Sequence, residues 1–218
     1  DAHFVRETEW QAAQAVTLWV DRSQAMTFTG AKDRANKADR ARLLGLALAV
    51  LLLKGGERVG LLPDLPPRMG RAQLEPFTMA LAAEDSTDFG TPPAGAMPAR
   101  SQAVFLSDFL GPTDVLEQTV ARAVAQGVRG VLVQILDPVE EEFPYQGRSI
   151  FESMTGVLRH ETLRAGDLQT RYRDRLAARK DALAALARHS GWQVLTHHTN
   201  QPPGTALMAL WQALDGGR

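Results

Sequence analysis

Short apolar segments that alternate with longer helix-like segments limit what this chain can fold into more than any other feature. Apolar runs typical of buried strands are found at residues 15–20, 58–62, 103–106, 130–136 and 192–196, and helix-like patterns at 37–54, 73–83, 113–125, 167–189 and 205–214. Strands that are joined through long crossover helices pair in parallel. The sequence therefore predicts one α/β domain over residues 1–218, built as a doubly wound, mainly parallel, Rossmann-like sheet with helices on both faces.

Several segments depart from this alternation. Residues 84–100 hold three prolines and two glycines, which predicts a long surface loop of the kind that often carries function. Residues 138–166 read as an insertion at one end of the sheet, with the acidic residues 140–142 in a solvated loop and a short hairpin after them. Residues 64–70 are expected to form a proline-rich loop, and residues 4–9 an edge strand that pairs with the first strand of the sheet.

Composition narrows the class of protein. The 218 residues include 44% hydrophobic and 22% charged residues, with a formal net charge of -1, so neither nucleic acid nor an anionic membrane is an expected partner. The sequence has no cysteine, which excludes disulfides, thiolate metal sites and thiol catalysis. The longest apolar run, residues 43–53, falls short of the ~20 residues that span a bilayer, and no signal peptide is visible. We therefore expect a cytoplasmic protein without membrane insertion.

Polar side chains follow two of the predicted strands at the point where each strand ends. Asp21 and Ser23 come directly after the first buried strand, and Ser107 and Asp108 come after the third. Because the carboxyl ends of parallel strands meet at one edge of a sheet, we expect the two acids to lie close together with a hydroxyl between them. Carboxylate and hydroxyl oxygens are ligands that Mg²⁺ accepts. The sequence thus predicts a candidate magnesium site at this edge.

A further set of segments occurs in a recognisable order along the chain. They are Val5-Arg6-Glu7, Val20-Asp21-Arg22-Ser23 with Met26, Gly56-Glu57-Arg58-Val59-Gly60-Leu61, Val104-Phe105-Leu106-Ser107-Asp108-Phe109, and Tyr172 in a long helix before Gly191-Trp192-Gln193-Val194. Together these segments resemble the domain-of-unknown-function family 58, a bacterial branch of the von Willebrand factor A-like fold. The resemblance covers almost the whole chain.

The resemblance implies a metal-ion-dependent adhesion site at the carboxyl edge of the sheet. Asp21 and Ser23 occupy its first-loop positions, and Asp108 occupies the position of the third-loop aspartate. The first loop of such a site reads D-x-S-x-S, whereas Ala25 stands here in place of the second serine. The loss of one direct ligand makes the site degenerate and should weaken binding of Mg²⁺, the cofactor that the resemblance implies.

Other residues of these loops are expected to supply a ligand or to touch a partner. The middle-loop hydroxyl comes from Thr87 or Thr91; Thr91 is our candidate ligand, and Thr87 stays open. Arg22, Ala25 and Ser107 are candidate partner-binding residues, because they flank the acids in the expected contact face. The positive charge of Arg22 would weaken cation binding, or would pair with one of the acids and make a metal unnecessary.

The resemblance implies an adaptor role rather than catalysis. Members of the family often work with MoxR-type AAA+ ATPases in the assembly or maturation of other proteins, so we expect protein–protein interaction with such a partner. The alternative is a hydrolase or phosphatase-like enzyme that uses Asp21. That chemistry normally needs a D-x-D pair, but Ser23 stands at the second position, and no nucleotide-binding or G-x-S-x-G motif follows a strand. His197 and His198 alternate across a strand and are not expected to share a metal ion.

Overall fold

The computed structural model describes residues 13–83, 85–95, 97–144, 149–152, 159–162 and 165–216. The strands in these ranges are β1 (Ala15–Val20), β2 (Arg58–Leu61), β3 (Leu65–Arg68), β4 (Gln102–Ser107), β5 (Arg129–Leu136), β6 (Ser149–Glu152), β7 (Arg159–Thr162) and β8 (Gln193–His198). The α-helices are α1 (Lys37–Lys54), α2 (Leu74–Ala82), α3 (Asp114–Ala125), α4 (Pro138–Glu142), α5 (Ala165–Ser190) and α6 (Pro203–Asp215). The short 3-10 helices η1 (Gln24–Thr27) and η2 (Arg71–Gln73) follow β1 and β3.

Six strands form one sheet in the order β3-β2-β1-β4-β5-β8. All neighbours in this sheet pair in parallel except β3, which pairs antiparallel with β2 at one edge. The chain leaves β1 toward β2 on one side and later enters β4 on the other side, so the strand order reverses between β1 and β4. In doubly wound sheets, ligands bind outside the carboxyl ends of the strands at this switch point. Asp21 and Asp108 both follow strands that flank it.

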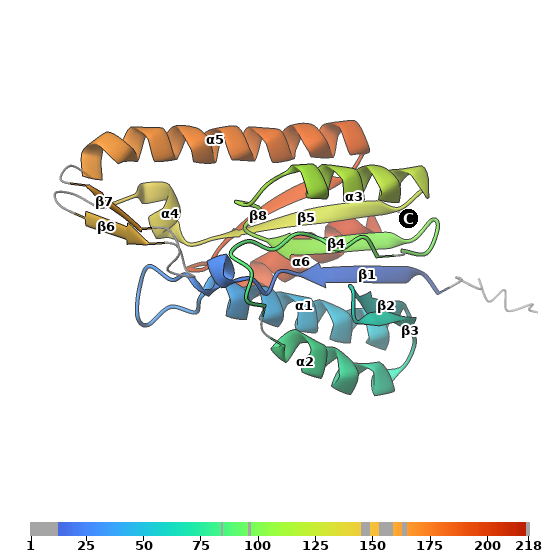
Figure 1. The fold of residues 1–218 in the computed structure, drawn as a ribbon. Coiled ribbons are helices and arrows are strands. Elements are labelled where there is room, and N and C mark those ends of the chain that lie inside the picture. The colour runs from blue at the N-terminus through green and yellow to red at the C-terminus, as the bar shows by residue number, and fades with distance from the viewer. Residues whose placement is uncertain are drawn as a thin grey trace, which may run out of the picture.

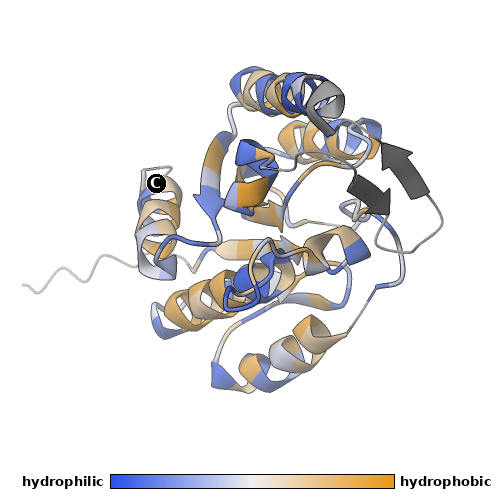
Figure 2. Cartoon of the chain, turned by 90° about the vertical axis from the view of Figure 1, so that its left-hand side faces the viewer, coloured by the Kyte–Doolittle hydropathy of each residue, from blue (hydrophilic) through white to orange (hydrophobic). Residues whose placement is uncertain are grey.

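Helices cover both faces of the sheet (Figure 1). α1, α2 and α6 pack on one face around a core that includes Leu48 and Phe77, and α3 and α5 pack on the other face around Phe105 and Trp192. Figure 2 looks onto the carboxyl ends of the strands and shows helices that carry both hydrophilic and hydrophobic residues, as elements with one buried side do. The predicted doubly wound α/β architecture is confirmed. No helix in the described ranges combines the length and the apolar character needed to cross a membrane.

The ends of α1 are set by local sequence, and they place Lys37 at the start of the helix. The side chain of Asn36 accepts a hydrogen bond from the N–H of Asp39 (2.7 Å), which caps the first turn. Gly56 has a φ of +86°, a conformation that suits glycine, and it lies just beyond the last turn. The bounds predicted from the sequence, 37–54, are those observed.

Two expectations about local structure are corrected. The proline-rich segment contains an edge strand, β3, because prolines are tolerated where one side of a strand has no partner. The acidic residues 140–142 belong to α4 rather than to a solvated loop, and Glu140 is buried. The edge strand expected at residues 4–9 lies outside the described residues. The expected hairpin in the insertion is confirmed as the antiparallel pair β6–β7.

Candidate functional site at the carboxyl ends of β1 and β4

Asp21 lies at the carboxyl end of β1, where it is 2% exposed. Its Oδ1 accepts a hydrogen bond from the backbone N–H of Ser23 (2.9 Å), and its Oδ2 accepts one from the hydroxyl of Ser107 (2.6 Å). Because Ser107 is the last residue of β4, the second bond ties the ends of two neighbouring strands together. Burial raises the pKa of the Asp21 carboxyl above 3.8, and the hydrogen bonds from Ser107 and Ser23 oppose that rise.

The loop between α2 and β4 closes over Asp21. The backbone N–H of Gln24 donates to the carbonyl of Thr87 (2.9 Å), so this loop is hydrogen-bonded to η1. Gly90 then passes directly over the acid, because a Cβ built on it would lie 2.1 Å from Asp21 Oδ1. No larger residue fits there without moving the loop or the carboxylate. The long loop predicted from its prolines and glycines is thus the lid of the site.

Asp108 is paired with a buried lysine that the sequence analysis did not single out. Lys37 is 1% exposed. Its Nζ donates to Asp108 Oδ2 (2.7 Å) and to Glu140 Oε1 (2.6 Å), while Asp108 Oδ1 accepts from the N–H of Leu110 (2.9 Å). Burial lowers the pKa of Lys37, but the charges of Asp108 and Glu140 outweigh burial and raise the pKa above 10.5. The side chain is therefore an ammonium ion in the folded protein.

Glu140 connects this pair to the end of β5. Its Oε2 accepts a hydrogen bond from the N–H of Asp137 (2.8 Å), which completes the capping box of α4 and aims Oε1 at Lys37. Burial raises the pKa of Glu140 above 4.5, and the charge of Lys37 opposes that rise. We call Asp21, Asp108, Glu140 and Lys37 the acid–lysine cluster.

Asp137 organises the polar groups beside the cluster and is fully buried. Its Oδ1 accepts hydrogen bonds from Arg34 Nη1 and the N–H of Val139, both 2.9 Å long, and its Oδ2 accepts one from the hydroxyl of Thr199 (3.0 Å). Burial alone would raise the pKa of Asp137, but its hydrogen bonds outweigh burial and lower the pKa below 3.8. One carboxylate thus fixes the segment before α1, the start of α4 and the end of β8.

The structure brings together three of the four predicted metal ligands. Asp21 and Asp108 share one edge of the sheet, close enough for the charge of Asp108 to raise the pKa of Asp21. Ser23 is fully buried two residues after Asp21, and its side chain lies close enough to the Asp21 carboxylate to lower the pKa of that acid. Thr91 follows Gly90 but is exposed, as is Thr87. The two acids therefore lie at the ends of neighbouring strands, with the Ser107 hydroxyl bound to Asp21, and metal binding by these residues stays a prediction.

As arranged, these residues do not fit a divalent ion. Mg²⁺ requires near-octahedral oxygen ligation, yet each carboxylate oxygen of Asp21 and Asp108 already accepts a hydrogen bond from the chain. No group of three or more His, Cys, Asp or Glu residues is arranged to hold a metal in the part of the chain that the structure describes. An entering ion would have to displace the Lys37 ammonium.

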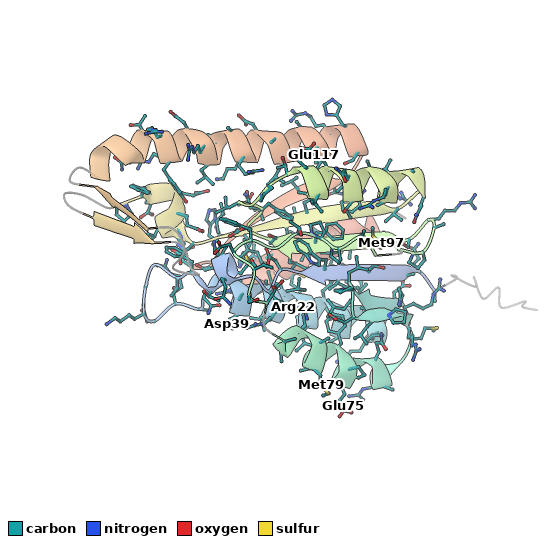
Figure 3. The ribbon with its side chains drawn as sticks, in the orientation of Figure 1. Arg22, Asp39, Glu75, Met79, Met97 and Glu117 are labelled. Atoms are coloured by element: carbon teal, nitrogen blue, oxygen red, sulfur yellow. The ribbon has the colours of Figure 1, made fainter. Side chains whose placement is uncertain are left out.

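The predicted partner-binding residues have other contacts. Arg22 does not pair with either acid of the site; its Nη2 lies 3.2 Å from Asp64 Oδ2, and its Nη1 donates to the carbonyl of Ala80 in α2, near which Arg22 is labelled in Figure 3. Ser107 is 1% exposed, and its hydroxyl donates a hydrogen bond to Asp21. Ala25 is half-buried and donates its N–H to a carbonyl of the covering loop. Their role in partner binding stays a prediction, and the more accessible surface lies next to them.

An open groove of about 600 Å³ adjoins the closed site. Phe89, which precedes Gly90, and Leu110, whose N–H is held by Asp108, form one wall. The remaining lining comes from α5: Tyr172, Arg175, Leu176, Ala178, Arg179 and Ala182. Phe89 is 45% exposed. The helical pattern at residues 167–189 was predicted from the sequence, but no local signal shows that this helix lies beside the two loops.

A family model described as "Protein of unknown function DUF58" matches residues 1–184 of the chain. The chain belongs to the DUF58 family. The match ends within α5, so β8 and α6 of this DUF58 chain lie beyond it. A comparison with curated proteins finds no match.

Two solved structures resemble this DUF58 chain in fold. The conserved hypothetical protein BatB from Bacteroides thetaiotaomicron has a TM-score of 0.56 and 14% sequence identity, over 94% of this chain and 98% of BatB. An aerotolerance-related membrane protein from Bacteroides fragilis, with multiple mutations to serines, has a TM-score of 0.51 and 14% identity, over 94% of this chain and 100% of the other. Similarity at this level of identity shows a shared fold.

A buried histidine near the site makes the folding stability of the DUF58 chain sensitive to acid. His197 in β8 is 3% exposed, and its Nε2 has no hydrogen-bond partner among the residues described. Burial lowers the pKa of His197 to about 4, and the charges of Arg40 and His198 add to that effect. His198 instead lies with its Nε2 3.1 Å from Glu141 Oε2. The two rings have different surroundings, as their alternation along a strand predicts.

We expect His197→Leu to make stability less sensitive to acid. The folded pKa of about 4 lies below the 6.5 of the unfolded chain, so the unfolded state takes up a proton first and stability falls as pH drops through this range. From about pH 7 to about pH 5, the wild type should lose about 2 kcal/mol through this group, and the variant should not. Urea unfolding at both pH values measures the difference, with the exposed His189→Leu as control. Equal losses in wild type and His197→Leu would contradict the assignment.

Proposed function

We propose that this DUF58 chain is a non-enzymatic protein-interaction domain whose contact surface is the groove beside the acid–lysine cluster. The observation that carries the proposal is how the groove is held. Phe89 is the neighbour of Gly90, which packs on Asp21, and the N–H of Leu110 is bound by Asp108. The buried acids therefore hold both loop residues of the wall in place. A preorganised wall binds a partner with a smaller loss of conformational freedom.

The lining of the groove indicates the chemistry of its partner. Arg175 and Arg179 lie one helical turn apart on α5, and neither has an ion pair within the described ranges. The other lining residues are apolar or aromatic, and no acid is among them. Charge complementarity favours a partner segment that places an apolar side chain against Phe89 and Leu110 and carboxylates against the two arginines.

A MoxR-type AAA+ ATPase is the partner that we propose, with the assembly or maturation of other proteins as the process served. The support for this finer assignment is the resemblance to domain-of-unknown-function family 58, which implies such a pairing. A degenerate adhesion site fits the proposal, because the contact surface is formed by loops and α5 without need of a bridging metal. A cytoplasmic location is likewise proposed.

The surroundings of Asp21 favour an interaction domain rather than the alternative, a hydrolase that uses this carboxylate. A nucleophilic carboxylate must reach its substrate, but Asp21 is 2% exposed and accepts hydrogen bonds on both oxygens. Gly90 covers it so closely that a Cβ at this position would clash with the carboxylate. Attack by this carboxylate would require the loop to open first.

We expect Phe89→Asp to weaken binding of a purified MoxR-type ATPase from the same organism at least about tenfold, since it removes an apolar anchor and adds a charge that the partner's acids repel. Arg175→Glu combined with Arg179→Glu should have a similar effect. The control is Met79→Asp, at a 70% exposed residue of α2, on the opposite side of the molecule from α5 (Figures 1 and 3). Binding that survives both groove changes would move the contact surface elsewhere, and a wild type that does not bind would refute the ATPase as partner.

A further inference from the structure

We propose that the ammonium group of Lys37 is the resident cation of this site, in the role that a divalent metal has in a metal-ion-dependent adhesion site. The inference concerns the cation alone and does not rest on the proposed function. Lys37 Nζ lies 2.7 Å from Asp108 Oδ2 and 2.6 Å from Glu140 Oε1. Asp108 is the residue that the resemblance assigns to the third loop of the metal site. The chain thus directs a fixed positive charge at the carboxylate that would otherwise bind the metal.

The ammonium group is satisfied by the protein itself. An ammonium has three N–H donors, and two of them are used by Asp108 and Glu140. Nζ also lies over the ring of Phe28, 5.7 Å from its centroid, where a cation is attracted by the aromatic face. The side chain is 1% exposed. A group enclosed in this way is held in one position and does not swing aside freely for another cation.

The neighbouring groups are arranged for one positive charge rather than two. Asp21 is held by Ser107 and by the backbone of Ser23, so its oxygens need no metal. Ala25 lacks the hydroxyl that the second serine of the D-x-S-x-S loop would supply. A divalent ion placed beside Asp108 would be repelled by the ammonium. The absence of the second serine and the presence of the lysine both weaken binding of a divalent ion.

The lysine comes from a part of the chain that a metal site would not use. Lys37 is the first residue of α1, and Asn36 caps that helix. The partial positive charge of a helix N-terminus disfavours a cation there, so a lysine at this position needs compensation from the acids that surround it. Asp108 from the end of β4 and Glu140 from α4 supply that compensation. The cluster therefore joins three elements through one cation.

Titration calorimetry with Mn²⁺ and Mg²⁺, with no partner present, tests this inference. The wild type should show no saturable binding, whereas Lys37→Ala should show saturable Mn²⁺ binding at least about tenfold tighter than the weakest affinity that the titration detects. The gain should vanish in Lys37→Ala combined with Asp108→Ala. Lys54→Ala, at the exposed end of the same helix, is the matched control and should behave as wild type.

Each result of this experiment bears on the proposal. Saturable Mn²⁺ binding by the wild type that is lost in Asp108→Ala would overturn it, because the ammonium would then not exclude the metal. A folded Lys37→Ala that gains no affinity would also overturn it. If Lys37→Ala does not fold in metal-free buffer, recovery of its circular dichroism spectrum on adding Mn²⁺ supports the proposal, and failure to recover in both Lys37→Ala and Lys37→Gln contradicts it.

Discussion

Replacing Lys37 by methionine should lower the free energy of unfolding by about 3–5 kcal/mol. Methionine is also a long, unbranched side chain, but it leaves the carboxylates of Asp108 and Glu140 buried without a counter-charge. These side chains are only 2% and 9% exposed, so water cannot replace the ammonium. Urea unfolding near neutral pH, followed by circular dichroism, measures the loss.

The size of this loss should depend on pH and on position. Without Lys37, burial raises the pKa of Glu140 further above 4.5, so the folded variant takes up a proton more readily than the unfolded chain. The variant therefore regains stability as pH falls, and its difference from the wild type shrinks. Lys54→Met, at the exposed end of α1, should change stability by no more than about 1 kcal/mol. A loss below about 1 kcal/mol for Lys37→Met would show that the cluster is not desolvated as described.

Replacing Asp137 by alanine should lower the free energy of unfolding by about 3 kcal/mol. The change removes the N-cap of α4 together with the acceptors for Arg34 and Thr199. Arg34 can turn to solvent because its side chain is 25% exposed, whereas the Thr199 hydroxyl stays buried. We therefore expect a somewhat smaller loss than for Lys37→Met. Urea unfolding of variant and wild type measures it.

Two variants separate the causes of that loss. Asp137→Asn keeps a side-chain oxygen for the N–H of Val139 and should recover part of the stability. Asp114→Ala, at the exposed first turn of α3, removes an acid of similar helix position without buried partners and should cost at most about 1 kcal/mol. An Asp137→Ala protein as stable as Asp114→Ala would mean that the hydrogen bonds at the end of β5 add little.

The fold was predictable because its signals are local. The run from Lys37 to Lys54 has a cap before it and two glycines after it, and its observed bounds are those predicted. Strands that end in Asp21 and Asp108 had to meet once parallel pairing was inferred. β3 was missed because Pro66 and Pro67 argue against a strand, and only its place at the edge of the sheet makes them acceptable.

The lysine of the site could not be predicted because its partners come from distant segments. Nothing local shows that the start of α1 lies over the ends of β4 and β5. Two signals were nonetheless present: a lysine in a first helical turn, which opposes the helix dipole, and Asp137-Pro138-Val139-Glu140, which has the spacing of a capping box with proline at N1. The second would have placed Glu140 in a helix rather than in a solvated loop.

A crystal structure of the wild type grown with Mn²⁺, with anomalous data collected at the manganese edge, tests the central claim most directly. The account predicts no anomalous peak between Asp21, Ser23 and Asp108, and Lys37 Nζ within hydrogen-bonding distance of Asp108 and Glu140. A manganese peak bound by Asp21 and Asp108, with the lysine turned away from them, would contradict it.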